Sequence, residues 1–416
     1  MKISISASLY KLAKLFKKKH AKLFLIGGCV RNAIIGIPCF DVDICGWLKL
    51  DEVEELLKDT EFSLNIKNET LGTADITCEN SSWEYTVLRT EKYPQGGAHK
   101  PESVEFVKSV EEDAFRRDFT MNSIYVDIIK GEFIDPFLGE MDIKRRQVCA
   151  VADPNEVFSH DGLRILRMIR FACELNFSIE SKTFGAAFNH RANLADISAE
   201  RKRNELLALL KCTEKYKDHT KSDAFLRGLH KYNKLGLWKF FSLPIQKVKF
   251  SLVKKADVES RFLALVIDIL HEINPRDKFA FLSHFLGSDG LGFTNEEVDE
   301  MTNVVLGYLD AIEVLNNKDY FFKYFNYFSK IAPLIKKKST KIYKKYNFFY
   351  KYLINNKIAI QVKDLEIKGS DIKKIYPNIP QRRYSYILNE LLSKVFDGAV
   401  ENTKQRLIEE VANYDY

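Results

Sequence analysis

The spacing of apolar residues divides the chain into a strand-rich first third and a longer helical remainder. Up to about residue 145, short runs rich in β-branched and aromatic residues alternate with polar turns, as at 84–88 and 123–129. After residues 153–154, an Asp-Pro pair, apolar residues recur every three or four positions, which is the period of a helix. A glycine-rich interruption at 287–293 and a break at 378–380 divide this helical part. The pattern predicts an α+β head followed by an all-helical remainder.

The first predicted strand, at 22–26, ends in a glycine pair that a helix follows at once. Gly27-Gly28 come next, and residues 29–35 have helical spacing. Backbone N–H groups at a helix start attract anions, and glycine lets a phosphate approach them closely. Arg31 lies in the first turn and could reach the same anion. The third glycine of a dinucleotide-binding fingerprint and the Gly-Lys-Ser/Thr of a Walker loop do not follow, so this segment alone predicts only a phosphate-binding turn.

Two acidic residues, Asp41 and Asp43, come on the next predicted strand. Alternation along a strand would place both carboxylates on one face, with Val42 on the other. Adjacent carboxylates repel each other, and a pair of divalent cations roughly 3.5–4 Å apart, as in phosphoryl-transfer sites, would explain them. For an isolated pair of this kind, a solvated turn after Gly36-Ile37-Pro38 is the simpler alternative.

Five segments, taken together and in order, resemble one family. The strand, glycine pair, Val-Arg and Asp-x-Asp of residues 22–43 resemble the nucleotidyltransferase superfamily that includes DNA polymerase beta. The closer resemblance is to class II tRNA nucleotidyltransferases, which are the CCA-adding enzymes, and to the related bacterial poly(A) polymerases. The other segments that carry it are Arg-Arg-Asp-Phe-Thr-Met-Asn at 116–122, Asp-Pro-Phe-Leu-Gly at 135–139, the predicted helix at 161–172, and Ser-Ala-Glu-Arg at 198–201 with Glu-Leu at 205–206.

The resemblance implies a domain organisation that the hydrophobic pattern alone does not give. A DNA polymerase beta-like catalytic head with a small mixed sheet would occupy residues 1–145. Three helical domains would follow: a neck at 146–215 that recognises the nucleobase, a body at 216–335 that binds RNA, and a tail at 336–416 that binds tRNA.

The same resemblance implies a role for each candidate site residue. Asp41 and Asp43 would be the catalytic residues and would hold Mg²⁺. The nucleotide-binding residues would be Gly28, Arg31, Arg117, Asp161, Arg164, Arg167 and Arg170. For Arg167, and above all for Arg170, packing within the neck is an alternative. Glu84 is a candidate third carboxylate on a neighbouring strand.

Asp161 and Arg164 are three positions apart on a predicted helix, so their side chains are neighbours. A carboxylate accepts from an exocyclic amine, and a guanidinium donates to ring acceptors. Cytosine and adenine offer that combination, whereas uracil and guanine present a carbonyl where the amine should be. The pair would therefore admit C and A. A surface ion pair worth well under ~1 kcal/mol is the alternative.

Two positions depart from the family's pattern. Asn32 stands where the family usually has Asp, which puts an ion pair in doubt. His160 stands where the family usually has Glu before Asp161, which removes a carboxylate expected to orient the helix.

The resemblance predicts that the protein adds C, C and A to the 3′ end of tRNA from CTP and ATP. Residues 89–94 resemble the flexible segment that helps the family switch from C to A. The alternatives are a CC-only or A-only enzyme, a poly(A) polymerase, and an idle RNA-binding protein on the same scaffold. Against the polymerase, no Gly-Arg-Arg-Phe-like segment lies between 50 and 105, and the tail segments 363–371, 387–392 and 401–404 resemble those of CCA-adding enzymes.

Composition agrees with a nucleic-acid partner. Of 416 residues, 64 are Lys or Arg and the formal net charge is +7, which permits RNA binding without requiring it. At 336–352, lysines alternate with aromatic residues, which indicates either RNA contact or a basic solvated face with a buried aromatic one. The expected contacts are the 3′ end and the elbow of tRNA, with no obligate protein partner.

Three further features bear on location. The seven cysteines are scattered and lack Cys-x-x-Cys spacing, which predicts reduced thiols in the cytoplasm and no zinc site. No apolar run approaches the ~20 residues of a membrane span. The basic amphipathic stretch at 10–19 lacks the features of a signal peptide and predicts a surface helix.

Overall fold

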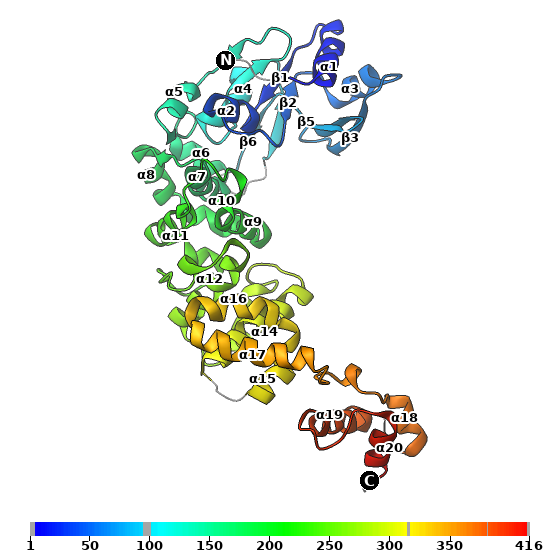
Figure 1. The fold of residues 1–416 in the computed structure, drawn as a ribbon. Coiled ribbons are helices and arrows are strands. Elements are labelled where there is room, and N and C mark those ends of the chain that lie inside the picture. Colours follow the sequence, from blue (N-terminus) through cyan, green and yellow to red (C-terminus); the bar gives the residue numbers. More distant parts are fainter. Residues whose placement is uncertain (1–4, 95–100, 314–316, 381, 414–416) are drawn as a thin grey trace. The chain divides into compact units, whose positions relative to one another are not determined.

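The structure is a computed structural model, and it describes residues 5–94, 101–313, 317–380 and 382–413, without the side chains of 317–319 (Figure 1). It divides the chain into two compact units. The first comprises Met1–Val248 with Phe285–Phe293, and the second comprises Lys249–His284 with Thr294–Tyr416. The finer division into head, neck, body and tail stays a prediction.

A seven-stranded mixed sheet forms the head of the first unit, in the order β3-β4-β5-β2-β1-β8-β9. Strands β2 and β5 are parallel, and the other neighbours are antiparallel. The prediction of an α+β head is therefore confirmed. The strands are β1 (Leu23–Ile26), β2 (Asp43–Gly46), β3 (Ser63–Asn68), β4 (Thr73–Cys78), β5 (Ser81–Val87), β8 (Tyr125–Asp127) and β9 (Phe133–Ile134).

The register of the central strands places Asp43 at the end of the sheet that faces the glycine turn. Asp43 lies opposite Ile26 of β1 and opposite Glu84 of β5, and Glu84 in turn lies opposite Asp75 of β4. All four residues of β1 are buried, as is Ile44 of β2. Continuous apolar strands of this kind suit a sheet covered on both faces.

Helices cover the sheet and supply the first part of the site (Figure 1). Helix α1 (Ala7–Lys18) packs on β1 and on α3 (Leu50–Leu57), and it buries Leu9, Leu12 and Phe16. It overlaps the surface helix expected at 10–19. Next to the sheet lie α2 (Gly28–Ile35), α4 (Val110–Phe115), the 3-10 turn η1 (Thr120–Asn122), α5 (Gly139–Lys144), and the ladder of β6 (Arg89–Lys92) with β7 (Ser103–Phe106).

The rest of the first unit is helical apart from one short parallel ladder of β10 (Gln147–Val148) and β11 (Ser178–Ile179). The prediction of an all-helical remainder missed this ladder, because two-residue strands leave no alternation to read. Helix α7 packs against α9 and α11. The elements are α6 (Pro154–His160), α7 (Leu163–Glu174), α8 (Ser181–Asn189), η2 (Arg191–Asp196), α9 (Ala199–Leu210), α10 (Cys212–Lys215), α11 (Ala224–Leu235) and η3 (Leu237–Phe241).

Helices also form the second unit. Among its described residues a core of Ile367, Ile372, Ile387, Leu391 and Leu407 joins the last three helices. None of the helices in the described ranges is long and apolar enough to cross a membrane. From residue 249 onward the elements are η4 (Val253–Lys255), η5 (Val258–Ser260), α12 (Arg261–Ile273), α13 (Lys278–Leu286), α14 (Asn295–Glu313), α15 (Asn317–Tyr324), η6 (Phe325–Tyr327), α16 (Phe328–Lys338), α17 (Thr340–Asn355), η7 (Val362–Asp364), α18 (Gly369–Ile375), α19 (Arg382–Phe396) and α20 (Lys404–Ala412).

The lysine- and aromatic-rich stretch covers the end of α16 and most of α17, and its aromatic residues divide between two environments. Tyr346 is fully buried and Tyr350 packs on Phe328. Phe348 and Tyr352 are instead 74% and 46% exposed. The alternative of a buried aromatic face with a basic solvated face is therefore met in part, because one face packs and the other is exposed; RNA contact by the exposed face stays a prediction.

We predict that Gly162→Ala destabilises the protein. Gly162 joins α6 to α7, and a Cβ built on it would lie 2.5 Å from the backbone oxygen of Asn193. The clash must move backbone, which typically costs roughly 1–3 kcal/mol. Thermal unfolding measures the loss.

The matched control is Gly185→Ala in α8, where an added Cβ meets nothing within 4 Å. Alanine in a helix should there be neutral or stabilising, by up to about 1 kcal/mol. Equal melting temperatures for the two variants would contradict the close packing at Gly162.

Candidate active site

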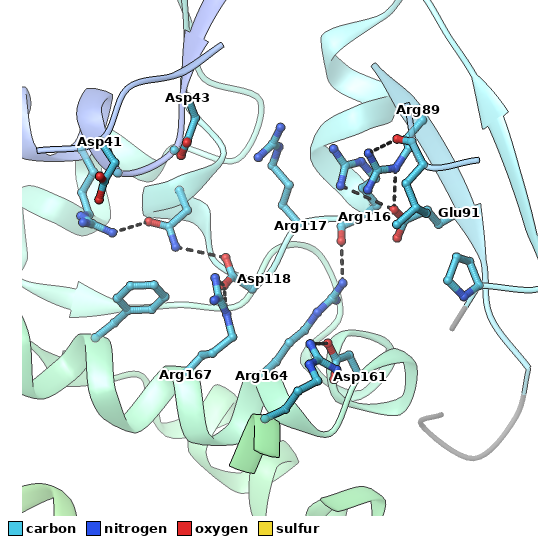
Figure 2. A pocket seen from close by; sticks show the side chains of 18 of the residues that line it. Asp41, Asp43, Arg89, Glu91, Arg116, Arg117, Asp118, Asp161, Arg164 and Arg167 are labelled. Carbon is cyan, nitrogen blue, oxygen red and sulfur yellow. Dashed lines mark hydrogen bonds and ion pairs between the residues drawn. The ribbon is translucent and has the colours of Figure 1, made fainter. Parts of the chain in front are cut away.

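A cavity of about 1140 Å³ in the first unit is lined by all the predicted catalytic and nucleotide-binding residues, but not by the candidate third carboxylate Glu84 (Figure 2). The glycine turn, the start of β2, the turn at 116–118 and α7 all contribute to its walls. Positive charge dominates the described lining. Its basic members are Arg31, Arg89, Arg116, Arg117, Arg164, Arg167, Arg170, Arg201 and Lys215.

Asp41 and Asp43 lie together at one side of this cavity (Figure 2). Only Asp43 is in the strand, as its first residue; Asp41 precedes it in extended chain, so the prediction of two strand residues was half right. Within the described residues, neither carboxylate makes a hydrogen bond or an ion pair with another side chain. Burial, and then repulsion from Glu84, raise the pKa of Asp43 to about 6.

These two carboxylates suit a divalent cation. They are unpaired although basic side chains surround them, and a cation would offset the charge that burial penalises. No three His, Cys, Asp or Glu side chains in the described ranges are grouped to hold a metal. Mg²⁺ commonly takes one or two carboxylates and completes its shell with water and substrate phosphates. The pair therefore fits such an ion.

Glu84, the candidate third carboxylate, already has a partner. Its carboxylate accepts from Lys67 Nζ at 3.0 Å, and the same ammonium lies 2.8 Å from Asp75. Asp75 and Glu84, on the neighbouring strands, therefore share the ammonium group of Lys67. Asp43, next to them, has no basic partner among the described residues.

The glycine turn approaches Asp43 closely. Gly27 has φ +74°, and a Cβ there would lie 3.1 Å from the Oδ2 atom of Asp43. Glycine adopts this left-handed conformation without strain. Helix α2 starts at Gly28, so its N-terminal N–H groups point toward the cavity, where they can bind an anion.

Arg31 is buried and held by neutral acceptors. Its Nη1 donates to Asn122 Oδ1 at 2.7 Å, and its Nε and Nη2 donate to Asn32 Oδ1 at 3.1 and 2.9 Å. Burial lowers the pKa of Arg31, and none of the carboxylates in the described ranges hydrogen-bonds to it. An anion in the cavity would offset that cost.

The Asn32 side chain makes a hydrogen bond that an aspartate at this position could not make. Its Nδ2 donates to the backbone oxygen of Pro38 at 2.8 Å and to the hydroxyl of Tyr216 at 2.9 Å. An aspartate has no hydrogen to donate to Pro38. The departure therefore replaces a charged contact to Arg31 by a neutral one that also fixes the loop before Asp41.

Arg117 points into the cavity between the two ends of the site (Figure 2). The fully buried Asp113 accepts from it at 2.9–3.0 Å, from Arg116 Nε at 2.7 Å and from the Tyr125 hydroxyl at 2.6 Å. Burial alone would raise the pKa of Asp113, but the two guanidinium groups hold it well below its usual range. One buried carboxylate thus positions two arginines.

Arg167 and Arg170 are held by different carboxylates. Arg167 donates to Asp118 Oδ2 through Nε and Nη2, at 2.9 and 2.7 Å. Arg170 donates to Glu205 at 2.6 Å and to Glu174 at 3.1 Å. Both line the cavity, but the contacts of Arg170 favour the alternative role of packing α7 on α9; its nucleotide role stays a prediction.

Asp161 and Arg164, the residues predicted to read the base, lie at the side of the cavity opposite Asp41 and Asp43 (Figure 2). Asp161 lies between α6 and α7 rather than on one helix with Arg164, which corrects the prediction, because the backbone of Asp161 is extended (φ −149°, ψ 108°) and α7 begins only after Gly162. Its Oδ1 accepts from Leu163 N at 2.9 Å, and Arg201 Nη2 lies 3.6 Å away. Arg164 donates to the backbone oxygens of Val157 at 3.2 Å and Arg116 at 2.6 Å.

The sequence analysis missed several lining residues. Arg201 and Arg116 belong to quoted motifs, and their place in those motifs was the available signal. Glu91 pairs with Arg89 Nε at 2.7 Å and lies 3.6 Å from Arg116. Local sequence gave no sign of this second network.

His160 stacks on Tyr93, with ring centroids 4.8 Å apart and planes 12° apart. Tyr93 also donates to Glu91. Where the family usually has a glutamate, this chain therefore uses a ring that joins the start of the neck to the segment at 89–94. Burial, and then the nearby Arg164, lower the pKa of His160.

Comparison with known proteins agrees with these observations. Residues 23–149 match the poly A polymerase head domain. The chain carries this nucleotidyltransferase head. A CCA-adding enzyme from Levilactobacillus brevis is 38% identical over 209 residues, which are 50% of this chain and 51% of that protein. One from Geobacillus kaustophilus is 38% identical over 194 residues, 46% of each chain. The chain thus matches about half the length of these curated relatives.

Solved structures extend the likeness to the whole fold. The CCA-adding enzyme of Bacillus stearothermophilus in complex with CTP has a TM-score of 0.70 at 23% identity, covering 97% of this chain and 95% of that one. The Thermotoga maritima enzyme complexed with tRNA_CCA has a TM-score of 0.58 at 20% identity, covering 98% and 95%. The chain has the fold of CCA-adding enzymes, and the resemblance seen in its motifs is confirmed.

We predict that Asp118→Asn lowers stability and flattens its dependence on pH. Burial would raise the pKa of Asp118, but Arg167 lowers it to about 2, against 3.8 ordinarily. A depressed folded-state pKa stabilises the protein above about pH 4, and this stability is lost as the pH falls toward 2. The shift corresponds to roughly 2 kcal/mol.

Urea unfolding between pH 7 and pH 3 measures the effect. The variant should be less stable at pH 7, and the gap to the wild type should narrow as the pH falls below 4. Asp196→Asn, which removes the same formal charge from an exposed site, is the control. A gap that stays constant with pH would show that the Asp118 carboxylate does not carry the effect.

Proposed function

We propose that the protein adds C, C and A to the 3′ end of tRNA from CTP and ATP, releasing diphosphate. The observation that carries the proposal is the unpaired Asp41 and Asp43 in a cavity whose other charged walls are mostly arginine. Phosphoryl transfer needs an electropositive cradle for the triphosphate and a separate acidic site for cations. Both lie in one cavity here.

The nucleotide would lie across the cavity with its triphosphate between the glycine turn and Arg117. The N-terminus of α2 at Gly28 would bind phosphate oxygens through N–H groups, and Arg31 and Arg117 would donate from guanidinium groups. Mg²⁺ held by Asp41 and Asp43 would supply activation of the tRNA 3′-hydroxyl and neutralise charge on the triphosphate. The protein's own part is orientation, because each arginine is already held by acceptors.

Asp161 and Arg164 would read the base at the other side. An exocyclic amine of C or A donates to the carboxylate, and the ring nitrogen accepts from the guanidinium. U and G offer the opposite pattern, so each would leave a buried polar group unpaired. Arg167, which is 35% exposed, is close enough to this end to contribute, whereas Arg170 is tied more fully to glutamates.

The relatives support the substrate class. The curated relatives described above are named CCA-adding enzymes, and solved structures of similar fold are described with CTP, ATP and tRNA. We assign residues 1–145 to the catalytic head, 146–215 to the neck, 216–335 to the body and 336–416 to the tRNA-binding tail. The protein as a whole would contact the 3′ end and the elbow of tRNA. The scattered cysteines and a tRNA substrate agree with a cytoplasmic location.

A CC-only enzyme, an A-only enzyme and a poly(A) polymerase would share this cavity. The segment at 89–94 favours full addition, since Arg89 and Glu91 line the cavity and Tyr93 connects it to His160. A protein that only binds RNA on the same scaffold would have no use for Asp41 and Asp43 left without ion-pair partners.

The decisive experiment incubates the protein with Mg²⁺, tRNA lacking its CCA end, and labelled CTP and ATP, and reads products at nucleotide resolution. We expect C, C and A to be added by the wild type and no incorporation by Asp41→Ala or Asp43→Ala. Both variants should still bind tRNA in a salt-sensitive manner, because binding rests largely on phosphate contacts.

Asp51→Ala, which removes an exposed acid in α3, is the matched control and should retain turnover. A ladder of A residues would identify a polymerase, and arrest after CC would identify a partial enzyme. Near-normal turnover by either cavity variant would refute the metal assignment.

We further predict that Asp161→Ala or Arg164→Ala relaxes base choice as well as slowing addition. C and A would lose a hydrogen bond worth roughly 1–3 kcal/mol, whereas U would lose a mismatch. The ratio of CTP to UTP incorporation at matched concentration should therefore fall. Arg191→Ala in η2, outside the cavity, should leave the ratio unchanged. A slower enzyme with an unchanged ratio would give the pair a structural role only.

A further inference from the structure

An exposed aromatic side chain stands at the metal end of the cavity. Phe40 lines the cavity, directly precedes Asp41 and is 62% exposed. Consecutive Cα atoms are about 3.8 Å apart, so this ring is anchored within one nucleotide's length of any ion held by Asp41. An exposed flat ring in such a cavity offers a face on which a nucleobase can stack.

A second aromatic ring, that of Tyr216, packs on the ring of Phe40. Tyr216, at the end of α10, is buried, and the two rings are stacked with centroids 6.1 Å apart and planes 25° apart. The Tyr216 hydroxyl accepts from Asn32, and Asn32 also donates to Pro38, two residues before Phe40. Asn32 therefore binds both the Tyr216 ring, through its hydroxyl, and the loop that carries Phe40.

A cation lies beside the two rings. Lys215 lines the cavity and is exposed, with its Nζ 5.9 Å from the centre of the Tyr216 ring. A flat aromatic surface next to an exposed ammonium group matches the chemistry of a single-stranded nucleic acid, in which bases stack on rings and phosphates bind cations.

The incoming nucleotide does not need this surface. In the proposed function its base lies at Asp161 and Arg164, at the opposite side of the cavity from Asp41 and Asp43 (Figure 2). The second substrate must bring its 3′-hydroxyl to the metal pair. Phe40 is therefore at the side where the acceptor strand has to end.

We propose that Phe40, supported by Tyr216, is a stacking platform for the terminal base of the RNA acceptor strand, and that Lys215 contacts the adjacent phosphate. The proposal rests on the proposed function and adds the second substrate's position to it. Stacking is tolerant of sequence because every base has a flat face. Such a platform can hold an acceptor that ends in any tRNA base, in C or in CC, as successive additions require.

The test compares Phe40→Ala with Phe40→Trp in single-nucleotide addition from CTP, on a tRNA acceptor without CCA. Loss of one base–aromatic stack should raise the KM for RNA roughly 5- to 100-fold in Phe40→Ala. The KM for CTP should stay near the wild-type value, and Phe40→Trp should restore the KM for RNA. Phe188→Ala, at a 44% exposed phenylalanine outside the cavity, is the control for losing a surface ring.

A second arm uses an acceptor whose terminal nucleotide lacks its base. If the platform holds that base, the abasic acceptor should bind the wild type as weakly as the intact acceptor binds Phe40→Ala, and combining both changes should add little. Fully additive losses, or an unchanged KM for RNA in Phe40→Ala, would overturn the proposal. Thermal unfolding of each variant separates these outcomes from misfolding.

Failure of the proposed function would look different. A wild-type protein that incorporates no nucleotide would refute the function itself. A wild type that extends tRNA normally, with Phe40→Ala equal to it in KM for RNA, would refute only the platform. Lys215→Gln gives a further measurement. It should weaken RNA binding and reduce the slope of log affinity against log salt concentration by about 1, which corresponds to one lost phosphate contact.

Discussion

The site depends on buried carboxylates that bind arginine side chains and fix their positions. Eight arginines line one cavity, and like charges at that density would repel each other without partners. Asp113 holds Arg116 and Arg117, and Asp118 holds Arg167. Each pair fixes a long flexible side chain before any ligand arrives, so less conformational entropy is lost on binding. The guanidinium groups are therefore placed by the protein and not by the substrate.

Within the described residues, the cavity also contains charged groups of both signs that no ion pair neutralises. Arg31 and Arg164 are hydrogen-bonded by neutral acceptors, so their charges are not cancelled locally. Asp43 stands in the reverse situation: it is half-buried, with a pKa raised to about 6, and no basic side chain is bonded to it. Buried charges without an ion-pair partner lower the free energy of unfolding, and a bound ligand of opposite charge would offset that cost. Their arrangement favours a ligand that is itself a polyanion bearing cations.

Sequence reasoning located the elements and the residues better than it located their contacts. The glycine turn, the strand of Asp43 and α7 were readable because each has a local pattern of apolar spacing or turn chemistry. The bond between Arg170 and Glu205 was not, since Glu205 lies 35 positions away and the pairing exists only after α7 and α9 pack. Asp161 was misplaced on a helix because helical spacing continues through Gly162, whereas the backbone of Asp161 is extended and α7 starts only after Gly162.

The size of the cavity has a consequence for inhibition. At about 1140 Å³ it exceeds the usual range for a single small ligand, roughly 300–1,000 Å³. A bisubstrate compound that linked a triphosphate mimic to a flat aromatic cap would engage the arginine cradle and the ring of Phe40 at once. Tethering makes the second contact intramolecular, so two weak fragments could combine into one tight ligand without either being improved.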